Sequence, residues 1–412
     1  MKFFSFKKNR ENELDPASEK NTSFSEKKEN KKNWKKIILI ILGLFVIAGA
    51  VFAFRTGYVL NKVSTGGNIL SNLYNVLPIA DNNLKGEEDG RINILLLGMR
   101  GEKVAGGGLL ADTIMIASIK PGESKASLFS IPRDFYVDVP DLGYRGKINA
   151  VHHYGEQKGT NQGMEEMKKV IGSIVGEEMH YAMSINFAGF EQLVDSLGGI
   201  ELNLKKEFVE PVQFLGVEQR CDDEVYTIPS GNFEEKRIRR ENGTYYDNPK
   251  RYPLCFAKIN PEALECGGVF KLPVGNIMLD GEQALCYVRS RATSSDFDRA
   301  RRQQDVLQEI KAKALSAGTL TDFGKVNKIL NALADNVRTD LQAWEMKKLF
   351  DIYQGMGEMQ ISRKVLENSE EGLLYVPENS PSGLGYILKP RGDNYDRIQE
   401  AFRNILNQQI GT

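Results

Sequence analysis

The stretch Ile92-Asn-Ile-Leu-Leu-Leu97-Gly98 decides the fold of this chain, because it is a nearly continuous apolar run that stops at a glycine. Such a run is typical of a buried central strand whose two faces are both covered. Two further runs with strand composition follow at residues 113–119 and 126–131, separated by the turn Lys120-Pro-Gly-Glu123. The folded part of the chain is therefore predicted to begin with three strands.

Segments with helical periodicity come next and alternate with strands. Met164, Met167, Ile171, Ile174 and Val175 recur on one face of a predicted helix. A helix over residues 187–197 ends at a glycine pair and is followed by a strand over residues 200–204. Further helices are predicted over residues 299–316, 323–337, 341–355 and 395–406, with a short strand over 385–388. This alternation predicts an α/β fold, a layered α/β/α domain with a central mixed sheet.

An uncharged apolar segment precedes this domain. Residues 37–54 would form a helix about 27 Å long, close to the hydrocarbon thickness of a bilayer. Lysines crowd the segment before it, so the positive-inside rule predicts a single-pass membrane protein with a cytoplasmic N-terminus and an extracytoplasmic main domain. A cleaved signal peptide is the alternative, but the charged leader is long and no small-residue cleavage site follows the apolar run.

Composition predicts the remaining organisation. Residues 1–36 are rich in Lys, Glu, Asn and Ser and are predicted to be a disordered basic cytoplasmic tail. Residues 55–90 are assigned to a juxtamembrane stalk and residues 91–412 to the extracytoplasmic domain, with a charged insertion at 205–270. The net charge of −1 and the pI of about 6.4 argue against a dedicated nucleic-acid binder.

All four cysteines lie in the part predicted to be exported. Cys221, Cys255, Cys266 and Cys286 can form two disulfides in an oxidising compartment, with three possible pairings. We expect Cys266 to pair with Cys286, on the assumption that two sequential strands bring them together, and Cys221 to pair with Cys255. A zinc site is the competing interpretation, but the chain has no Cys-x-x-Cys pair and no histidine near these cysteines.

Arginines cluster in Arg289-Ser-Arg291 and in the run Asp296-Phe-Asp298-Arg299-Ala-Arg-Arg302-Gln303 that follows it. On a strand, Arg289 and Arg291 would point to one face, and on a helix beginning near Asp298, Arg299 and Arg302 would share another. Guanidinium forks engage phosphate oxygens bidentately. The run therefore predicts a cradle for a doubly phosphorylated ligand, against the alternative of a solvated basic helix.

Several motifs occur in a fixed order between about residue 91 and residue 310. They are Asn93-Ile-Leu-Leu-Leu-Gly98, Ala111-Asp112-Thr113-Ile-Met, Ser130-Ile-Pro-Arg133-Asp134, Lys147-Ile-Asn149-Ala, Asn186-Phe-x-Gly-Phe190, Leu279-Asp-Gly-Glu-Gln-Ala284 and the arginine run just described. In this order, behind a single apolar segment, they resemble the LytR-CpsA-Psr family. The resemblance implies a membrane-anchored phosphotransferase that moves a glycopolymer from an undecaprenyl-pyrophosphate carrier to peptidoglycan.

The resemblance also implies roles for individual residues. Arg133, Arg289, Arg291 and an arginine of the pair Arg299 and Arg302 would hold the pyrophosphate and stabilise charge on the departing lipid phosphate. Gln303 would add a hydrogen bond. Asp112 would hold Mg²⁺ or influence the acceptor hydroxyl, unless it only caps a turn before the strand at 113. Supporting positions are assigned to Asp134, Asn149 and Asp298, with the two aspartates orienting arginines.

One position departs from the family pattern. Arg100 stands where the family usually has a second carboxylate, so a cation replaces a metal ligand and Mg²⁺ dependence is left open. Arg100 is expected to contact the pyrophosphate and take over part of the charge role of the ion. The alternatives are a non-catalytic binding or scaffold protein for lipid-linked polymer, and a polyprenyl-pyrophosphate hydrolase. A transcriptional regulator is disfavoured, because the short cytoplasmic tail has no basic helix-turn-helix pattern.

Overall fold

The computed structural model describes residues 83–101, 108–210, 218–221, 226–245, 248–257, 266, 269–291, 293–316, 328–329, 331, 334–356, 359–381 and 383–407. The chain divides into two units, Met1–Ala53 and Phe54–Thr412, and all of these residues belong to the second. The cytoplasmic tail and the apolar segment at 37–54 lie outside the described residues. Within the described residues, no helix combines the length and the apolar character needed to cross a membrane.

A six-stranded mixed sheet organises the domain. Its strand order is β14-β6-β1-β2-β3-β15. Strand β1 pairs antiparallel with β2 and parallel with β6, and β15 adds parallel to β3 at one edge. The strands are β1 (Ile92–Met99), β2 (Ala111–Lys120), β3 (Lys125–Ser130), β6 (Tyr181–Asn186), β14 (Val337–Thr339) and β15 (Gln360–Val365). The predicted α/β class and mixed sheet are confirmed.

Strand β1 lies in the middle of this sheet because both of its faces are covered. Leu95 and Leu97 are buried in the main hydrophobic core, whereas Leu96 points to the opposite face. Gly98, the last residue but one of the strand, pairs with Thr113 on β2, and a Cβ on Gly98 would lie 2.9 Å from the Cβ of Thr113. A side chain at Gly98 would therefore push apart the two strands that carry the start of the site.

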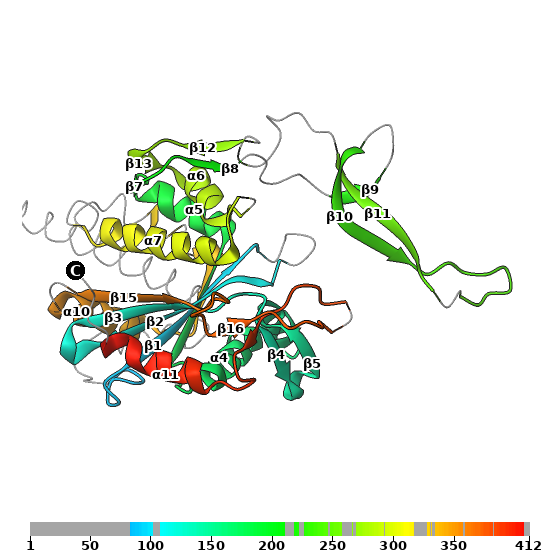
Figure 1. Cartoon of the computed structure of the whole chain (residues 1–412). Coiled ribbons are helices and arrows are strands. Elements are labelled where there is room, and N and C mark those ends of the chain that lie inside the picture. Colours follow the sequence, from blue (N-terminus) through cyan, green and yellow to red (C-terminus); the bar gives the residue numbers. More distant parts are fainter. Residues whose placement is uncertain are drawn as a thin grey trace, which may run out of the picture. The chain divides into compact units, whose positions relative to one another are not determined.

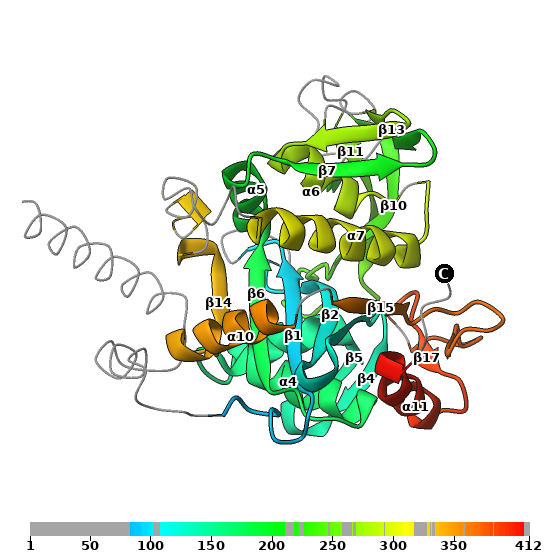
Figure 2. The same ribbon diagram turned by 90° about the vertical axis from the view of Figure 1, so that its left-hand side faces the viewer.

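Helices cover both faces of the sheet (Figures 1 and 2). One face carries α4 (Gln162–Val175) and α11 (Asp396–Asn404), with the β4 (Tyr136–Val139) and β5 (Tyr144–Lys147) hairpin and α3 (Val151–Glu156) nearby. The other face carries α5 (Phe187–Ser196), α6 (Gly281–Arg289) and α7 (Asp296–Ala314). A further helix, α10 (Ala343–Gly355), follows β14. The predicted layers are thus present within the described part of the chain.

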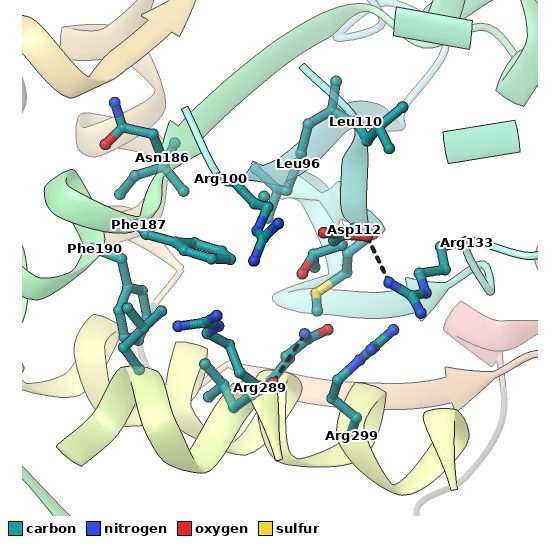
Figure 3. Close-up of a pocket in the computed structure, with 18 of the residues that line it drawn as sticks. Leu96, Arg100, Leu110, Asp112, Arg133, Asn186, Phe187, Phe190, Arg289 and Arg299 are labelled. Atoms are coloured by element: carbon teal, nitrogen blue, oxygen red, sulfur yellow. Dashed lines mark hydrogen bonds and ion pairs between the residues drawn. The ribbon is translucent and has the colours of Figure 1, made fainter. Parts of the chain in front are cut away.

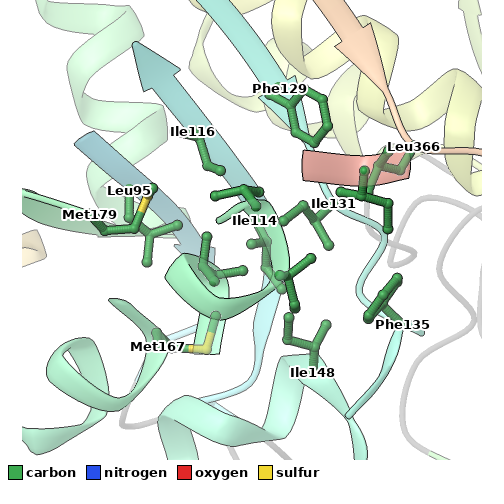
Figure 4. Close-up of a cluster of buried hydrophobic side chains, with 14 of the residues drawn as sticks. Leu95, Ile114, Ile116, Phe129, Ile131, Phe135, Ile148, Met167, Met179 and Leu366 are labelled. Carbon is green, nitrogen blue, oxygen red and sulfur yellow. The ribbon is translucent and has the colours of Figure 1, made fainter. Parts of the chain in front are cut away.

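The main core lies between the sheet and α4 (Figure 4). The five apolar residues predicted to share one face of this helix are all fully or almost fully buried there, from Met164 to Val175. Phe402 of α11 closes the core by meeting Phe129 of β3 edge to face, with ring centroids 5.2 Å apart. The amphipathic pattern of α4 therefore identifies the face of the sheet that carries the main hydrophobic core.

A second core joins the helices of the other face to two small strand pairs. Val194 of α5, Leu285 of α6 and Val306 of α7 pack together in it. The strand pairs that cover it are β7 (Ile200–Leu204) with β13 (Gly275–Leu279) and β8 (Phe208–Glu210) with β12 (Phe270–Leu272). Between β8 and β12 the chain forms a three-stranded sheet, β9 (Glu218–Arg220), β10 (Tyr226–Lys236) and β11 (Lys250–Ala257).

Several predicted elements differ from the observed ones. Arg289 ends helix α6 and is not on a strand, because Asp280 and Gln283 form a capping box that starts a helix. Helix α7 begins at Asp296, three residues before the predicted start, because Ser295 caps it. Val337, placed at the end of a helix, begins edge strand β14. The predicted strand at 385–388 is displaced to β17 (Lys389–Pro390), which pairs with β16 (Leu374–Tyr375).

Both expected disulfides are present. Cys221 bonds to Cys255 within the three-stranded sheet, and Cys266 bonds to Cys286. The reason given for the second pairing was wrong, because Cys286 lies on helix α6 and not on a strand. Cys286 is buried in the second core and Cys266 packs against it. This disulfide therefore fastens the insertion to the helix that ends in Arg289.

The two disulfides are expected to differ in their effect on stability. Replacing the core pair, C266A/C286A, should lower the free energy of unfolding of the domain by about 3 kcal/mol, since it removes a bond that lies in the second core and fastens the insertion to α6. C221A/C255A should leave the main unfolding transition nearly unchanged, because this bond lies within the three-stranded sheet and, although Cys255 is buried there, neither cysteine packs in the two larger cores. Urea denaturation followed by circular dichroism measures both. Equal losses, or full thiol labelling of the unreduced wild type, would contradict the assignment.

Candidate active site

A cavity of about 760 Å³ lies between the sheet and helices α5, α6 and α7. Apolar side chains line most of it: Leu96, Met115, Met183, Ile185, Phe187, Phe190, Leu193, Leu285, Val288, Leu307, Ile310 and Val337. They come from both the sheet and the helices. Figure 3 shows Phe187 and Phe190 on one side of the cavity, Asp112, Arg133 and Arg299 on the other, and Arg100 and Arg289 between them. The cavity therefore combines an apolar part with a strongly charged part.

Five arginines bring the charged part together from separate segments. Arg100 follows β1, Arg133 follows β3, Arg289 ends α6, Arg291 lies just beyond it, and Arg299 projects from α7. Lys147 and Asn149 also line the cavity. Cations so close together repel one another unless carboxylates or an anionic ligand compensate them. Of the predicted ligand-binding arginines, all but Arg302 line this cavity.

The carboxylate of Asp112 is held in place by Arg133. Asp112 is the second residue of β2, and its Oδ1 accepts a hydrogen bond from Nη1 of Arg133 at 2.7 Å (Figure 3). Burial alone would lower the pKa of Arg133, but the carboxylates of Asp112, Asp296 and Asp134 together raise it above its ordinary value. Arg133 is thus fully charged and oriented toward the acidic residue of the site.

Asp296 is the residue that the sequence interpretation missed. Its carboxylate lies 3.3 Å from Arg299, 3.4 Å from Arg291 and 3.5 Å from Arg133. Burial alone would raise the pKa of Asp296, but these three guanidinium groups outweigh burial and hold it below its usual range. It is therefore a shared counterion. The sequence could have predicted the pair of Asp296 with Arg299, because residues three apart on a helix are neighbours on its surface.

Arg299 is the least exposed of the cavity arginines. Burial, with smaller contributions from Arg133 and Arg291, lowers its pKa to about 10, although Asp296 acts in the opposite direction. Arg289 stacks over the ring of Phe187, with its guanidinium carbon 4.4 Å from the ring centroid. That contact places a cation at the boundary between the apolar and the charged parts of the cavity.

Two predicted supporting residues have different positions. Asp134 is buried at the cavity wall, where its Oδ1 lies 2.6 Å from Nζ of Lys147 and its Oδ2 lies 3.6 Å from Nε of Arg133. Asp298 instead closes the capping box of α7 and pairs with Arg301, away from the cavity. Only the first of these aspartates contacts a cation that lines the site.

Arg302 does not line the cavity. Its guanidinium donates to the carbonyl oxygens of Tyr287 and Ser290 and to the hydroxyl of Ser294. It is buried and also lies over the ring of Phe208. Arg302 therefore secures the segment between α6 and α7, which carries Arg291. The next residue, Gln303, lines the cavity while its Nε2 donates to the carbonyl of Val288 at 3.2 Å.

The donor set does not fit a magnesium ion held by the protein alone. The described residues contain no group of three or more His, Cys, Asp or Glu side chains arranged to hold a metal. Asp112 and Asp134 line the cavity, but each carboxylate already pairs with a cation. Mg²⁺ bound through a single carboxylate would also need phosphate oxygens and waters. The described residues of the cavity therefore offer Mg²⁺ no carboxylate that is free of a competing cation.

Loss of the shared counterion should destabilise the domain unless an anion replaces it. In D296N, three guanidinium groups keep their positive charge without a common carboxylate, so we expect a loss of about 1–3 kcal/mol at neutral pH. Inorganic pyrophosphate should raise the Tm of D296N more than that of the wild type. The exposed D351N, which removes the same charge next to Lys347, is the matched control. An equal response to pyrophosphate in all three proteins would contradict this role.

The carboxyl group of Asp296 should also make the free energy of unfolding depend on pH. Because the folded pKa of Asp296 is depressed, its contribution is present above the unfolded pKa of about 3.9 and is lost as the pH falls through the folded pKa. The difference in unfolding free energy between wild type and D296N should therefore shrink below about pH 4. Urea titrations at a series of pH values measure it, and a constant difference would be the contrary result.

Comparison with known proteins finds a family and named relatives for this chain. A family model described as the LytR_cpsA_psr family matches residues 58–400. TagU of Enterococcus faecalis, named a polyisoprenyl-teichoic acid–peptidoglycan teichoic acid transferase, is 27% identical over 302 residues, which are 72% of this chain and 73% of that protein. The protein of the same name from Bacillus anthracis is 26% identical over 370 residues, covering 87% and 93%.

Solved structures agree on the fold. The crystal structure of a transcriptional regulator from Enterococcus faecalis matches with a TM-score of 0.51 and 21% identity, covering 79% of this chain and 92% of that one. A protein from Streptococcus agalactiae matches with a TM-score of 0.51 and 20% identity, covering 79% and 91%. At this identity they show the fold alone. Since the family model spans most of the sequence, the chain belongs to the LytR-CpsA-Psr family.

Proposed function

We propose that this protein is a phosphotransferase that moves a glycopolymer from a polyprenyl-pyrophosphate carrier to peptidoglycan or a related envelope acceptor. The observation that carries the proposal is the single cavity whose apolar part opens onto five arginines. A lipid pyrophosphate has the same two-part chemistry, with a hydrocarbon chain next to a compact double phosphate. The names of the curated relatives, which are teichoic acid transferases, support the same reaction class.

The two ends of the substrate are expected to occupy the two parts of the cavity. The lipid next to the pyrophosphate would lie among the side chains of β1, β6, α5 and α6, represented by Leu96, Met183, Phe190 and Leu285. Arg289, stacked on Phe187, would mark the boundary at which the first phosphate begins. The glycopolymer and the acceptor would then lie on the side of Asp112 and Arg133.

The transfer is a displacement at phosphorus to which these residues contribute. The acceptor hydroxyl oxygen forms a bond to the phosphorus that carries the glycopolymer, and the bond from that phosphorus to the bridging oxygen breaks. The bridging oxygen leaves with the electron pair as polyprenyl phosphate, whose charge the arginines stabilise. The hydroxyl proton passes to Asp112, whose carboxylate Arg133 orients.

Arg100 supplies positive charge where a metal would otherwise be needed. It lines the same cavity as Asp112 and Arg289, and its guanidinium lies between Phe187 and Asp112 in Figure 3. Arginine keeps its charge at every physiological pH and offers several donors in one plane. We assign to it part of the neutralisation of the pyrophosphate charge.

The location that this function requires agrees with the sequence. The uncharged segment at residues 37–54 is proposed to anchor the protein in the cell membrane with the N-terminus in the cytoplasm. Two disulfides in the described domain support exposure to an oxidising compartment. The carrier lipid and the peptidoglycan acceptor are both reached from that side of the membrane.

Removing a cavity arginine should abolish transfer without unfolding the protein. The full chain is incubated with a synthetic undecaprenyl-pyrophosphate oligosaccharide and a peptidoglycan fragment, and the products are identified by mass spectrometry. Wild type should form a phosphodiester-linked conjugate, and R289A or R291A should lower the rate by about 100-fold or more. The surface variant R363A is the control, because Arg363 pairs only with exposed Asp305 among its described contacts.

Other products would identify the alternatives. Bound but unchanged lipid with wild type would point to a non-catalytic polymer-binding protein. Polyprenyl phosphate without a conjugate would point to a hydrolase, in which water takes the place of the acceptor hydroxyl.

Arg100 and magnesium are tested in the same assay. Transfer by wild type should persist in the presence of a chelator, because Arg100 provides the charge that an ion would supply. R100A should lose at least about tenfold in rate with chelator and recover part of it with Mg²⁺. Complete loss of wild-type activity on chelation would show that Arg100 does not replace a metal.

A further inference from the structure

A buried carboxylate holds the segment that carries Arg291. Glu210 is the last residue of β8 and is fully buried. Its Oε1 accepts a hydrogen bond from the backbone N–H of Thr293 at 2.8 Å, and its Oε2 lies 3.1 Å from the hydroxyl of Thr293. The same hydroxyl lies 3.1 Å from the carbonyl oxygen of Val209. Because Thr293 follows Arg291 closely in the chain, β8 is fastened directly to this part of the site.

Arg291 lies outside any helix or strand. It follows the end of α6 at Arg289 and precedes the start of α7 at Asp296. Its side chain is 50% exposed, and its ion pair with Asp296 is 3.4 Å long. Holding an exposed, flexible side chain ready for a ligand costs conformational entropy. Fixing the backbone on both sides of Arg291 reduces the freedom that is lost when an anion binds.

Two buried charged groups fix the backbone on either side of Arg291. Before it, the guanidinium of Arg302 donates to the carbonyl oxygen of Ser290. After it, the carboxylate of Glu210 accepts from Thr293. The two charges are also coupled, since burial lowers the pKa of Arg302 and Glu210 is among the groups that act in the opposite direction. Glu210 therefore supports both ends of the segment, one directly and one through Arg302.

Stability alone does not account for this carboxylate. Both described hydrogen bonds of Glu210 come from the neutral Thr293, and burying a carboxylate among neutral donors costs folding free energy. Apolar packing already attaches β8 to the second core. The ring of Phe208 meets that of Tyr287 with centroids 5.0 Å apart and that of Phe270 with centroids 6.2 Å apart. Glu210 adds a charged contact that this packing does not require.

These contacts assign a role to Glu210 in the site. We propose that Glu210 is a positioning residue, which fixes the backbone so that the guanidinium of Arg291 stays at the cavity and ready for a pyrophosphate; the identity of that ligand rests on the proposed function. Glu210 is fully buried and does not line the cavity, whereas Arg291 does. Its charge should therefore matter for anion binding only while Arg291 is present. A glutamate that merely stabilised the domain would matter equally without that arginine.

The test is a double-mutant cycle on the affinity of the full chain for inorganic pyrophosphate, measured by phosphorus NMR titration. E210Q keeps the size of the side chain, removes its charge and should weaken binding about fivefold. In an R291Q background, which leaves the other cavity arginines in place, E210Q should have no further effect. In an R100Q background the fivefold effect should remain, because Arg100 follows β1. E201Q, at an exposed glutamate of β7, is the matched control and should bind like wild type.

A second variant keeps the test decisive if circular dichroism shows that E210Q does not fold. T293V removes the hydroxyl that faces Oε2 of Glu210 and leaves the backbone N–H bond to Oε1. Thr293 is exposed, so the fold should tolerate valine. T293V should weaken pyrophosphate binding about twofold, again only while Arg291 is present.

The outcomes separate this role from the proposed function. Unchanged affinity in E210Q, or equal weakening with and without Arg291, would overturn the positioning role; for T293V the same two results would do so. Wild type that binds no pyrophosphate would refute the anion site of the proposed function, and this role with it. Coupling through Arg291 without any transfer in the mass-spectrometric assay would support the positioning role and overturn the transferase function.

Discussion

The structure depends on the compensation of several guanidinium groups that face one cavity. Arg133, Arg291 and Arg299 come from three different segments, and the carboxylate of Asp296 lies within 3.5 Å of each. Without it, their repulsion would drive apart the loop after β3 and the start of α7. A carboxylate has only two oxygens, so it cannot occupy all the N–H groups of three guanidiniums. The arginines are therefore held in place and still line the cavity with N–H groups that can bind an anion. Stability and anion binding are in this way supplied by the same ionic cluster.

The sheet separates the demands of folding from those of the site. Leu95 and Leu97 of β1 belong to the main core, whereas Leu96, on the other face, lines the cavity, which Leu97 reaches only near the end of the strand. Helix α4 buries its whole apolar face, while α5, α6 and α7 leave apolar side chains such as Phe190 and Ile310 in contact with the cavity. Some apolar side chains of α5, α6 and α7 pack in the second core, and others line the cavity instead. The latter form the apolar part of the proposed site, where the lipid would bind.

The sequence was sufficient for the sheet class, the first three strands and the face of α4, because these depend on local periodicity. Both disulfide pairings were predicted correctly, but Cys266–Cys286 was predicted from a strand that the structure replaces with helix α6. The sequence did not predict the different roles of residues of the same type that have different surroundings in the fold. Arg299 and Arg302 are one helical turn apart and were treated alike, but one lines the cavity and the other bonds to backbone carbonyls. Asp296 was overlooked because its importance arises from Arg133, a residue distant in the chain. Edge strands β14 and β15 were missed because their pairing partners, and not their own composition, define them.

The concentration of arginines has a consequence for the end of the reaction cycle. The cluster that stabilises a departing lipid phosphate also attracts that phosphate once it is free, and a phosphate monoester carries about as much negative charge as the disubstituted pyrophosphate from which it was released. The product therefore competes with the next carrier lipid for the same donors. Under the proposed function, turnover is governed by how fast the spent lipid leaves the cavity, so an enzyme that removes or recycles lipid phosphate would set the working rate of this protein in the envelope.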